Sequence, residues 1–234
     1  MAIAFDSSSN YGTWASGATI TKKHTTSGAD RVLIVYVLSN ATSGSDRCTG
    51  VTYGGVAMTL LTKNTFGSGE SNTVYEFGLV APALGENDIV ASFSPNVVNG
   101  NIGAISLTGA KQTGLPDAFA TGNRVDQTLT LALTTVADNC WLVGACANRQ
   151  GNTVSAGTGT TLRSFDNTNT FSGMFDSNGA KTPAGSHSLI VSRASGTQTF
   201  SGVIVSVAPS EVTPTPTTRR RRRTSHAQGN PMIY

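Results

Sequence analysis

The stretch Arg31-Val-Leu-Ile-Val-Tyr-Val-Leu38 decides the fold class of this chain. Four of its eight residues are valine or isoleucine, and β-branched side chains favour the pleated strand. Because no polar residue alternates with the apolar ones, the strand should be covered on both faces, as central strands are. Residues 140–146 (Cys-Trp-Leu-Val-Gly-Ala-Cys) and 201–207 (Ser-Gly-Val-Ile-Val-Ser-Val) have the same character and predict two more central strands.

The rest of the body alternates apolar and polar residues with a period of two, which is typical of strands. The clearest turn is Gly54-Gly55 within Val51-Thr-Tyr-Gly-Gly-Val-Ala-Met58, because both glycines can take the positive φ of a two-residue hairpin. No helical pattern exceeds two turns. We expect strands at residues 2–7, 18–24, 31–39, 50–53, 56–62, 73–80, 88–94, 101–109, 127–135, 140–148, 161–165, 171–176, 187–193 and 199–208.

Short connections between so many short strands favour antiparallel hairpins over parallel crossovers. The prediction is therefore an all-β fold, an antiparallel two-sheet sandwich of jelly-roll type, with an extended C-terminal arm. One β-sandwich domain should span residues 1–209, and residues 210–234 should form the arm. Residues 105–110 and 203–208 echo each other at the ends of long β stretches, without a fixed sequence repeat.

The order of several motifs resembles a loosely defined family of β-sandwich domains found in phage virion proteins and bacterial surface proteins. The resemblance covers residues 30–110, and residues 130–208 look like its continuation. Its motifs are the strand 31–38, the Gly-Gly hairpin at 51–58, and the segments Val74-Tyr-Glu-Phe-Gly-Leu-Val-Ala-Pro82, Gly85-Glu-Asn-Asp-Ile-Val-Ala91 and Gly103-Ala-Ile-Ser-Leu-Thr-Gly109. The resemblance implies a virion or cell-surface module and no reaction, and the arm is not part of it.

The basic charge of the chain is concentrated in the arm. The whole chain carries 16 Lys+Arg against 13 Asp+Glu, a net charge of +3. Residues 219–234 hold five arginines and no acid, which leaves 11 basic and 13 acidic groups, a net charge of −2, on residues 1–218. A Thr-Pro linker precedes the run and favours an extended backbone, so the run should bind an anionic partner at a distance from the body.

Two classes of partner suit this arm. We expect it to dock on other virion proteins in a homo-oligomer or symmetric assembly, with the closing Pro-Met-Ile-Tyr segment as an apolar anchor. Nucleic acid is the second class, since five guanidinium groups would neutralise about five phosphates. A solvated tail without function is the third reading. The partner-binding residues of the arm would be Arg219, Arg220, Arg221, Arg222, Arg223, Met232, Ile233 and Tyr234.

The body offers little catalytic chemistry. His24 and His187 lie in no recognisable motif and read as strand-end or surface residues, and no Gly-x-Ser-x-Gly elbow occurs. No Cys/His spacing suits zinc, although the oxygen-rich segments 166–169 and 176–179 could ligate calcium. The three cysteines read as free thiols. We therefore expect no enzyme activity, no cofactor and no metal.

The sequence predicts a structural protein of a phage-type virion, a capsid decoration, neck or tail accessory protein. It would be made in the host cytoplasm, since residues 1–6 do not resemble a signal peptide. No apolar stretch approaches the roughly 18 residues of a membrane span, so no membrane partner is expected. The alternative is a carbohydrate-binding adhesin module, with sugars held by Tyr11 and Trp14 in a polar loop at residues 10–14. A capsid-forming jelly roll that packages its genome with the arginines is a third reading.

Overall fold

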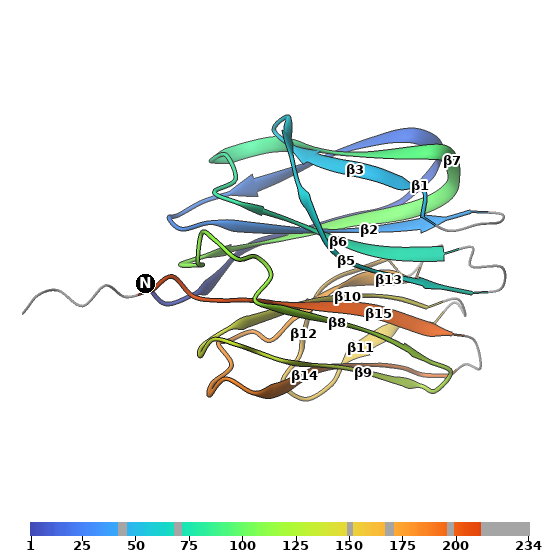
Figure 1. Ribbon diagram of the computed structural model, residues 1–234. Helices are drawn as coiled ribbons and strands as arrows, with labels where there is room; N and C mark the ends of the chain where they lie inside the picture. Colours follow the sequence, from blue (N-terminus) through green and yellow to red (C-terminus); the bar gives the residue numbers. More distant parts are fainter. Residues whose placement is uncertain (42–45, 68–71, 149–151, 167–170, 196–198, 212–234) are drawn as a thin grey trace, which may run out of the picture.

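The chain is all-β. The computed structural model describes residues 1–41, 46–67, 72–148, 152–166, 171–195 and 199–211, and within them the backbone forms strands and turns but no helix (Figure 1). It follows that the described residues include no helix able to cross a membrane. The strands are β1 Ala4–Thr26, β2 Val32–Asn40, β3 Cys48–Tyr53, β4 Val56–Ala57, β5 Thr59–Phe66, β6 Asn72–Val80, β7 Gly85–Thr108, β8 Ala118–Arg124, β9 Thr128–Thr134, β10 Trp141–Asn148, β11 Val154–Ala156, β12 Thr161–Asp166, β13 Ser172–Asp176, β14 Ser186–Arg193 and β15 Phe200–Val207.

The strands form three sheets in which neighbouring strands pair antiparallel, as predicted. The seven-stranded sheet has the order β4-β3-β7-β2-β6-β5, and β1 pairs with β7 beside this path. The five-stranded sheet has the order β12-β13-β10-β15-β8, and the three-stranded sheet the order β11-β14-β9. The predicted hairpin is confirmed: Tyr53 pairs with Val56, and Gly54 and Gly55 have φ values of 54° and 80°.

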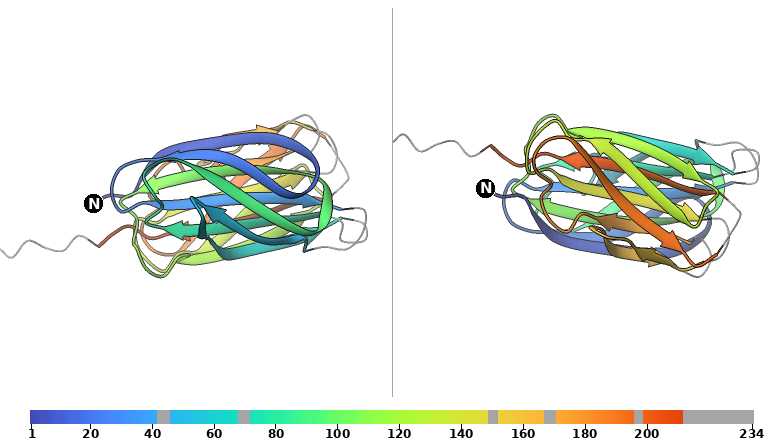
Figure 2. Two further views of the ribbon diagram at one scale, coloured as in Figure 1. Left: turned by 90° about the horizontal axis from the view of Figure 1, so that it is seen from above. Right: turned by 90° about the horizontal axis from the view of Figure 1, so that it is seen from below.

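The seven-stranded sheet curls over on itself because β1 and β7 are long and belong to two layers. The first half of β7 pairs with β3 and its second half with β2, while β1 follows β7 along both halves (Figure 2, left). Register shifts in β1 between Asn10 and Thr13 and between Gly17 and Thr19 accompany this bend. Such bulges raise the local twist and re-aim a strand, so one strand can cross from one layer to the next.

Three hydrophobic cores lie between the resulting layers (Figure 1). Leu33, Val35 and Val37 of β2 point into the core enclosed by the curled sheet. The alternate β2 residues, such as Ile34, point into a core that includes Val143 of β10 and lies between the seven- and five-stranded sheets. A third core fills the space between the five- and three-stranded sheets. The predicted burial of β2, β10 and β15 on both faces is confirmed, since each contributes to two cores.

The second half of the chain repeats the strand pairing of the first. The pairs β8–β15, β10–β15, β10–β13 and β12–β13 correspond to β1–β7, β2–β7, β2–β6 and β5–β6. The pairs β9–β14 and β11–β14 correspond to the ladders that the first half of β7 forms with the second half of β1 and with β3. Strand β4 has no counterpart. The echo between residues 105–110 and 203–208 therefore marks the last strand of each half.

Backbone details follow the same correspondence. The residue two positions before β2 is Asp30, with a φ of 49°, and the residue two positions before β10 is Asn139, with a φ of 58°. The amide of Ala81 donates to the carbonyl of Arg31 at 2.9 Å, as the amide of Lys181 donates to that of Cys140 at 2.8 Å. The two halves thus share turn geometry as well as strand order.

Several expected elements differ from the observed ones. The expected strands 2–7 and 18–24 are parts of one strand, β1, which begins at Ala4, so the polar loop expected at residues 10–14 is wrong: this segment pairs with β7. Residues 88–94 and 101–109 likewise fall in, or directly after, the single strand β7. Strands β8 and β11 were not expected. Strand β8 contains few large apolar residues and lies at a sheet edge, and β11 has only three residues, too few to show alternation.

Candidate functional site

The arm was predicted to span residues 210–234; the structure describes its first two residues, Ser210 and Glu211, and residues 212–234 lie outside the described part. Arg219, Arg220, Arg221, Arg222, Arg223, Met232, Ile233 and Tyr234 are therefore not placed by the structure. The described surface nearest to these residues is the one around Glu211, where the described chain ends.

The two aromatic residues expected in a loop lie on β1 instead. Tyr11 is partly buried against the core inside the curled sheet, and the Lys22 ammonium lies 5.8 Å from the centre of its ring. Burial raises the pKa of the Tyr11 hydroxyl. Trp14 pairs with Gly100 of β7 along the ladder, and its side chain is outside the described part of the structure. The ring of Tyr11 thus already has a cation–π contact, which no local sequence pattern predicts.

A groove of about 550 Å³ opens beside Glu211. Both ends of the described chain build it: the Met1 amino group donates to Ser210 Oγ at 3.1 Å, and the Ser210 amide donates to the Gly109 carbonyl at 2.7 Å. Figures 1 and 2 show the N-terminus and the end of β15 at this same end of the molecule. The groove is lined by Met1, Ala2, Ile3, Lys111, Ala137, Asp138, Asn139, Ala180, Ala208, Pro209, Ser210 and Glu211.

The groove is mostly apolar, with charges of both signs among its lining residues. Alanines from three separate connections, Ala137, Ala180 and Ala208, line it, and their short side chains leave its volume open. Lys111 and Glu211 form an exposed ion pair at 3.5 Å. Such a surface suits apolar side chains flanked by polar groups. Sequence reasoning missed it because its residues come from five separate segments.

A cluster of serines, a histidine and an aspartate lies on β1 and β7. His24 Nδ1 is 2.8 Å from Ser9 Oγ, and His24 Nε2 is 3.1 Å from Ser106 Oγ. Ser106 Oγ in turn donates to Asp6 Oδ2 at 2.7 Å. His24 is only 2% exposed, and this burial lowers the pKa of its imidazole to about 4, against the opposing charge of Asp6. The sequence placed His24 at a strand end or on the surface; it is near the end of β1, but buried.

These residue types are those of acyl-transfer catalysis, but the internal repeat identifies a structural role. The Asp6 carboxylate accepts hydrogen bonds from Ser106 and from the Ser27 amide. In the second half, Asp117 accepts from Ser206 at 3.0 Å and from the Val136 amide at 2.8 Å.

In the first half, this aspartate–serine contact links the start of β1 and the end of β7 to the turn before β2. In the second half, the equivalent contact links the start of β8 and the end of β15 to the turn before β10. In the second half the position of His24 is taken by Leu133, which pairs with His187 as His24 pairs with Asn87. The contact recurs without an imidazole, so it requires no histidine chemistry.

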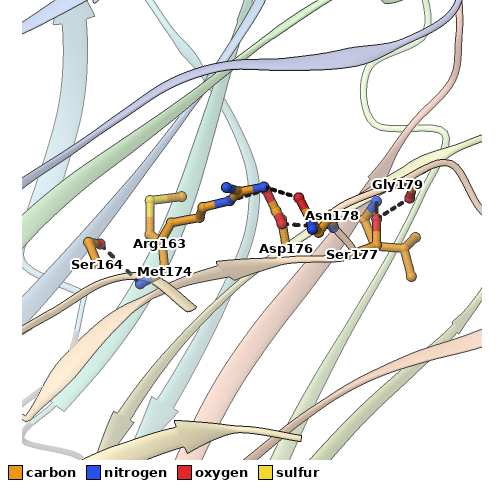
Figure 3. Close-up of polar contacts among 8 residues, drawn as sticks. Arg163, Ser164, Met174, Asp176, Ser177, Asn178 and Gly179 are labelled. Carbon is orange, nitrogen blue, oxygen red and sulfur yellow. Dashed lines mark hydrogen bonds and ion pairs between the residues drawn. The ribbon is translucent and has the colours of Figure 1, made fainter. Parts of the chain in front are cut away.

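Arg163 of β12 makes a compact set of polar contacts within the second half (Figure 3) and touches the first half through a cation–π contact with Phe5. Its Nε donates to Asp176 Oδ2 and its Nη2 to Asn178 Oδ1, both at 2.8 Å. Its guanidinium carbon lies 3.8 Å from the centre of the Phe5 ring on β1. Asp176 Oδ1 accepts from the Asn178 amide, so both carboxylate oxygens of Asp176 already have partners. The other segment considered for calcium, residues 166–169, lies outside the described residues except for Asp166. Among the described residues no group of three or more His, Cys, Asp or Glu could hold a metal ion.

The three cysteines are free thiols, as expected. Burial raises the pKa of Cys48, Cys140 and Cys146 to about 12. The thiolate is the nucleophilic form of cysteine, so none of the three is poised for reaction at neutral pH.

Comparisons of this chain with protein-family models, with curated proteins and with solved structures find no match.

Proposed function

We propose that this protein is a structural component of a phage-type virion, a capsid decoration, neck or tail accessory protein. The observation that carries the proposal is the separation of charge. Five adjacent arginines follow a Thr-Pro linker, beyond a β body whose first 218 residues carry a net charge of −2. An arm of this composition cannot bury a core of its own, so its role in the proposal is to bind another surface.

The strand order of each half supports this assignment, and we propose that each half is a two-sheet sandwich of jelly-roll type. Each half counts eight strands if β1 and β7 are each taken as two and β4, which has no counterpart, is left out; in the second half these are β8 to β15 in order. The first, eighth, third and sixth strands (β8, β15, β10 and β13 in the second half) share one sheet, and the second, seventh and fourth (β9, β14 and β11) share the other. This is the pairing order of a jelly roll, with the fifth strand joined to the first sheet instead of the second. Jelly rolls occur in viral capsid proteins and in lectins.

The proposed partners are other virion proteins in a symmetric assembly. Residues 212–234 span up to about 80 Å when extended, enough to cross a neighbouring subunit. A modest contact through the body and a second through the arm would reinforce each other, because the first contact raises the effective concentration for the second. Arginine suits the arm's role, since its planar guanidinium binds carboxylates and phosphates with two parallel hydrogen bonds.

Particle incorporation tests this function. Tagged protein is supplied during phage growth, particles are banded on a density gradient, and bound protein is quantified for three chains: the full chain, a chain lacking residues 212–234, and one with Arg219 to Arg223 changed to Ser. We expect both variants to lose occupancy, and an Arg-to-Lys version of the run to retain more than the Ser version.

Undiminished occupancy of the truncated chain would refute the anchoring role of the arm. Loss of particle binding after nuclease treatment would assign the arginines to nucleic acid. Absence of the full chain from particles, together with selective binding on a glycan array, would favour the adhesin alternative.

A further inference from the structure

The groove and the arm meet at one point of the molecule. Ala208, Pro209, Ser210 and Glu211 line the groove, and the sequence continues beyond Glu211 for 23 residues. The last four of these are Pro231-Met-Ile-Tyr234, the most apolar stretch of the arm. A groove lined mostly by apolar side chains therefore opens where an apolar segment is tethered.

We infer that the groove is the docking site of residues 231–234 of the same chain. The inference rests on the proposed function, because it assigns the place where the arm is held before a virion partner competes for it. In this arrangement the chain carries its own competitor for assembly. Release of residues 231–234 from the groove is then the step that makes the arm available.

The groove fits this occupant in size and chemistry. Its volume of about 550 Å³ lies within the roughly 300–1,000 Å³ of sites that enclose a small ligand. Ile3, Ala137, Ala180 and Ala208 offer apolar contact for methionine and isoleucine side chains. Ser210 Oγ is bonded to Met1 and Asp138 Oδ1 accepts from the Ala184 amide, so the second carboxylate oxygen of Asp138 is an acceptor on this lining for a tyrosine hydroxyl, which prefers a hydrogen-bond partner when buried.

The tether allows the segment to return to the body. Residues 212–230 form a linker of 19 residues, in which the Thr-Pro segment and the arginine run favour an extended backbone, so the turn back toward the body falls to residues 224–230, which have neither feature. A linker able to span the two sites gives an intramolecular effective concentration that reaches about millimolar. At micromolar protein concentrations the chain's own segment therefore outcompetes the same segment of a second copy. The net charge of −2 on the body and the five arginines of the arm also favour association.

A photo-crosslinking residue at position 232 of the full chain tests the placement directly. After irradiation at micromolar concentration, peptide mapping should find crosslinks to residues 1–3, 137–139 and 208–211, in protein of monomer mass. Crosslinks elsewhere on the body, or no crosslinks to it, would overturn the inference. Crosslinked dimers joined at the same groove residues would also overturn it, since the occupant would then be a second copy.

A groove-filling substitution provides the second test. Ala180 is exposed and lines the groove, so Ala180→Trp should fill it without disturbing the cores. We expect the groove crosslinks to fall at least tenfold in Ala180→Trp and to persist in Ala132→Trp, which changes an exposed alanine of β9 outside the groove. An unchanged crosslink yield in Ala180→Trp would contradict docking in this groove.

Particle incorporation separates this inference from the proposed function. If the arm is held in the groove, Ala180→Trp should incorporate at least as well as the unmodified chain. The proposed function fails by a different result: absence of the full chain from particles, or unchanged incorporation after removal of residues 212–234.

Discussion

Glu76 should make the stability of this protein fall as the pH rises. Glu76 lies on β6, where it pairs with Tyr36 of β2 and Thr62 of β5, and it is 0% exposed. Neither carboxylate oxygen has a hydrogen-bond partner among the described residues. Val74, on the same face of β6, belongs to the core between the two halves. Burial raises the pKa of the Glu76 carboxyl well above 4.5, so the folded protein holds it protonated.

The sign of the effect follows from proton linkage. The unfolded chain releases the Glu76 proton above about pH 4.3, whereas the folded chain keeps it until the raised pKa is reached. The contribution of Glu76 to stability is therefore fully present below the unfolded pKa and is lost as the pH rises. The loss is about 1.4 kcal/mol for each pH unit below the folded pKa. Glu76→Gln cannot titrate and removes this dependence.

The assay is urea denaturation at pH 5, 6 and 7, reported as the difference in unfolding free energy between Glu76→Gln and the unmodified chain. The difference cancels every other titrating group, including His24, whose depressed pKa acts in the opposite direction over part of this range. We expect the difference to grow in favour of the variant as the pH rises, by up to about 1.4 kcal/mol per pH unit as long as the folded chain keeps the proton. Glu86→Gln is the control, because Glu86 is exposed and paired with Lys23. Parallel pH profiles for Glu76→Gln and the unmodified chain would refute the reasoning.

Three further predictions concern stability. Gly55→Val should lower the melting temperature, because a φ of 80° costs a β-branched residue about 1 kcal/mol or more, and an unchanged melting curve would contradict the hairpin geometry. Arg163→Ala should cost about 3–5 kcal/mol in urea denaturation, since it leaves the fully buried Asp176 side chain without its cation; a loss below 1 kcal/mol would show that the ion pair is dispensable. His24→Leu should keep the native far-UV circular dichroism spectrum. Because the folded pKa of His24 is about 4, the unmodified chain should lose about 3 kcal/mol relative to this variant between pH 6.5 and 4, and equal acid sensitivity would argue against a neutral buried imidazole.

The central strands could be predicted from local sequence patterns. A run such as residues 31–38 has apolar side chains on both faces of a strand, and such a strand can only be stable when both faces are covered. The Gly54-Gly55 hairpin could also be predicted from the local sequence, because glycine adopts the positive φ values of its two turn residues without a steric penalty. The arm, too, is predicted from composition alone, from five arginines behind a Thr-Pro linker.

The continuity of β1 and β7 was decided only by the tertiary structure. Polar residues and glycine at positions 10–12 interrupt the alternation of β1 and read as a loop, yet the ladder with β7 continues past a bulge there. A ladder is held by backbone hydrogen bonds, which any residue but proline can donate, so a partner strand can keep a segment extended against its local pattern.

The repeat of the two halves and the groove also required the tertiary structure, for the same physical reason. Asp6 and Ser106 correspond to Asp117 and Ser206 through strand pairing, while most neighbouring residues differ in kind, as His24 differs from Leu133. A β fold constrains register and burial more strongly than residue identity, so the repeat is preserved in hydrogen bonds and largely lost from the sequence. The groove arises where connections of both halves meet the two ends of the described chain, and no local pattern encodes the space that short side chains leave between distant segments.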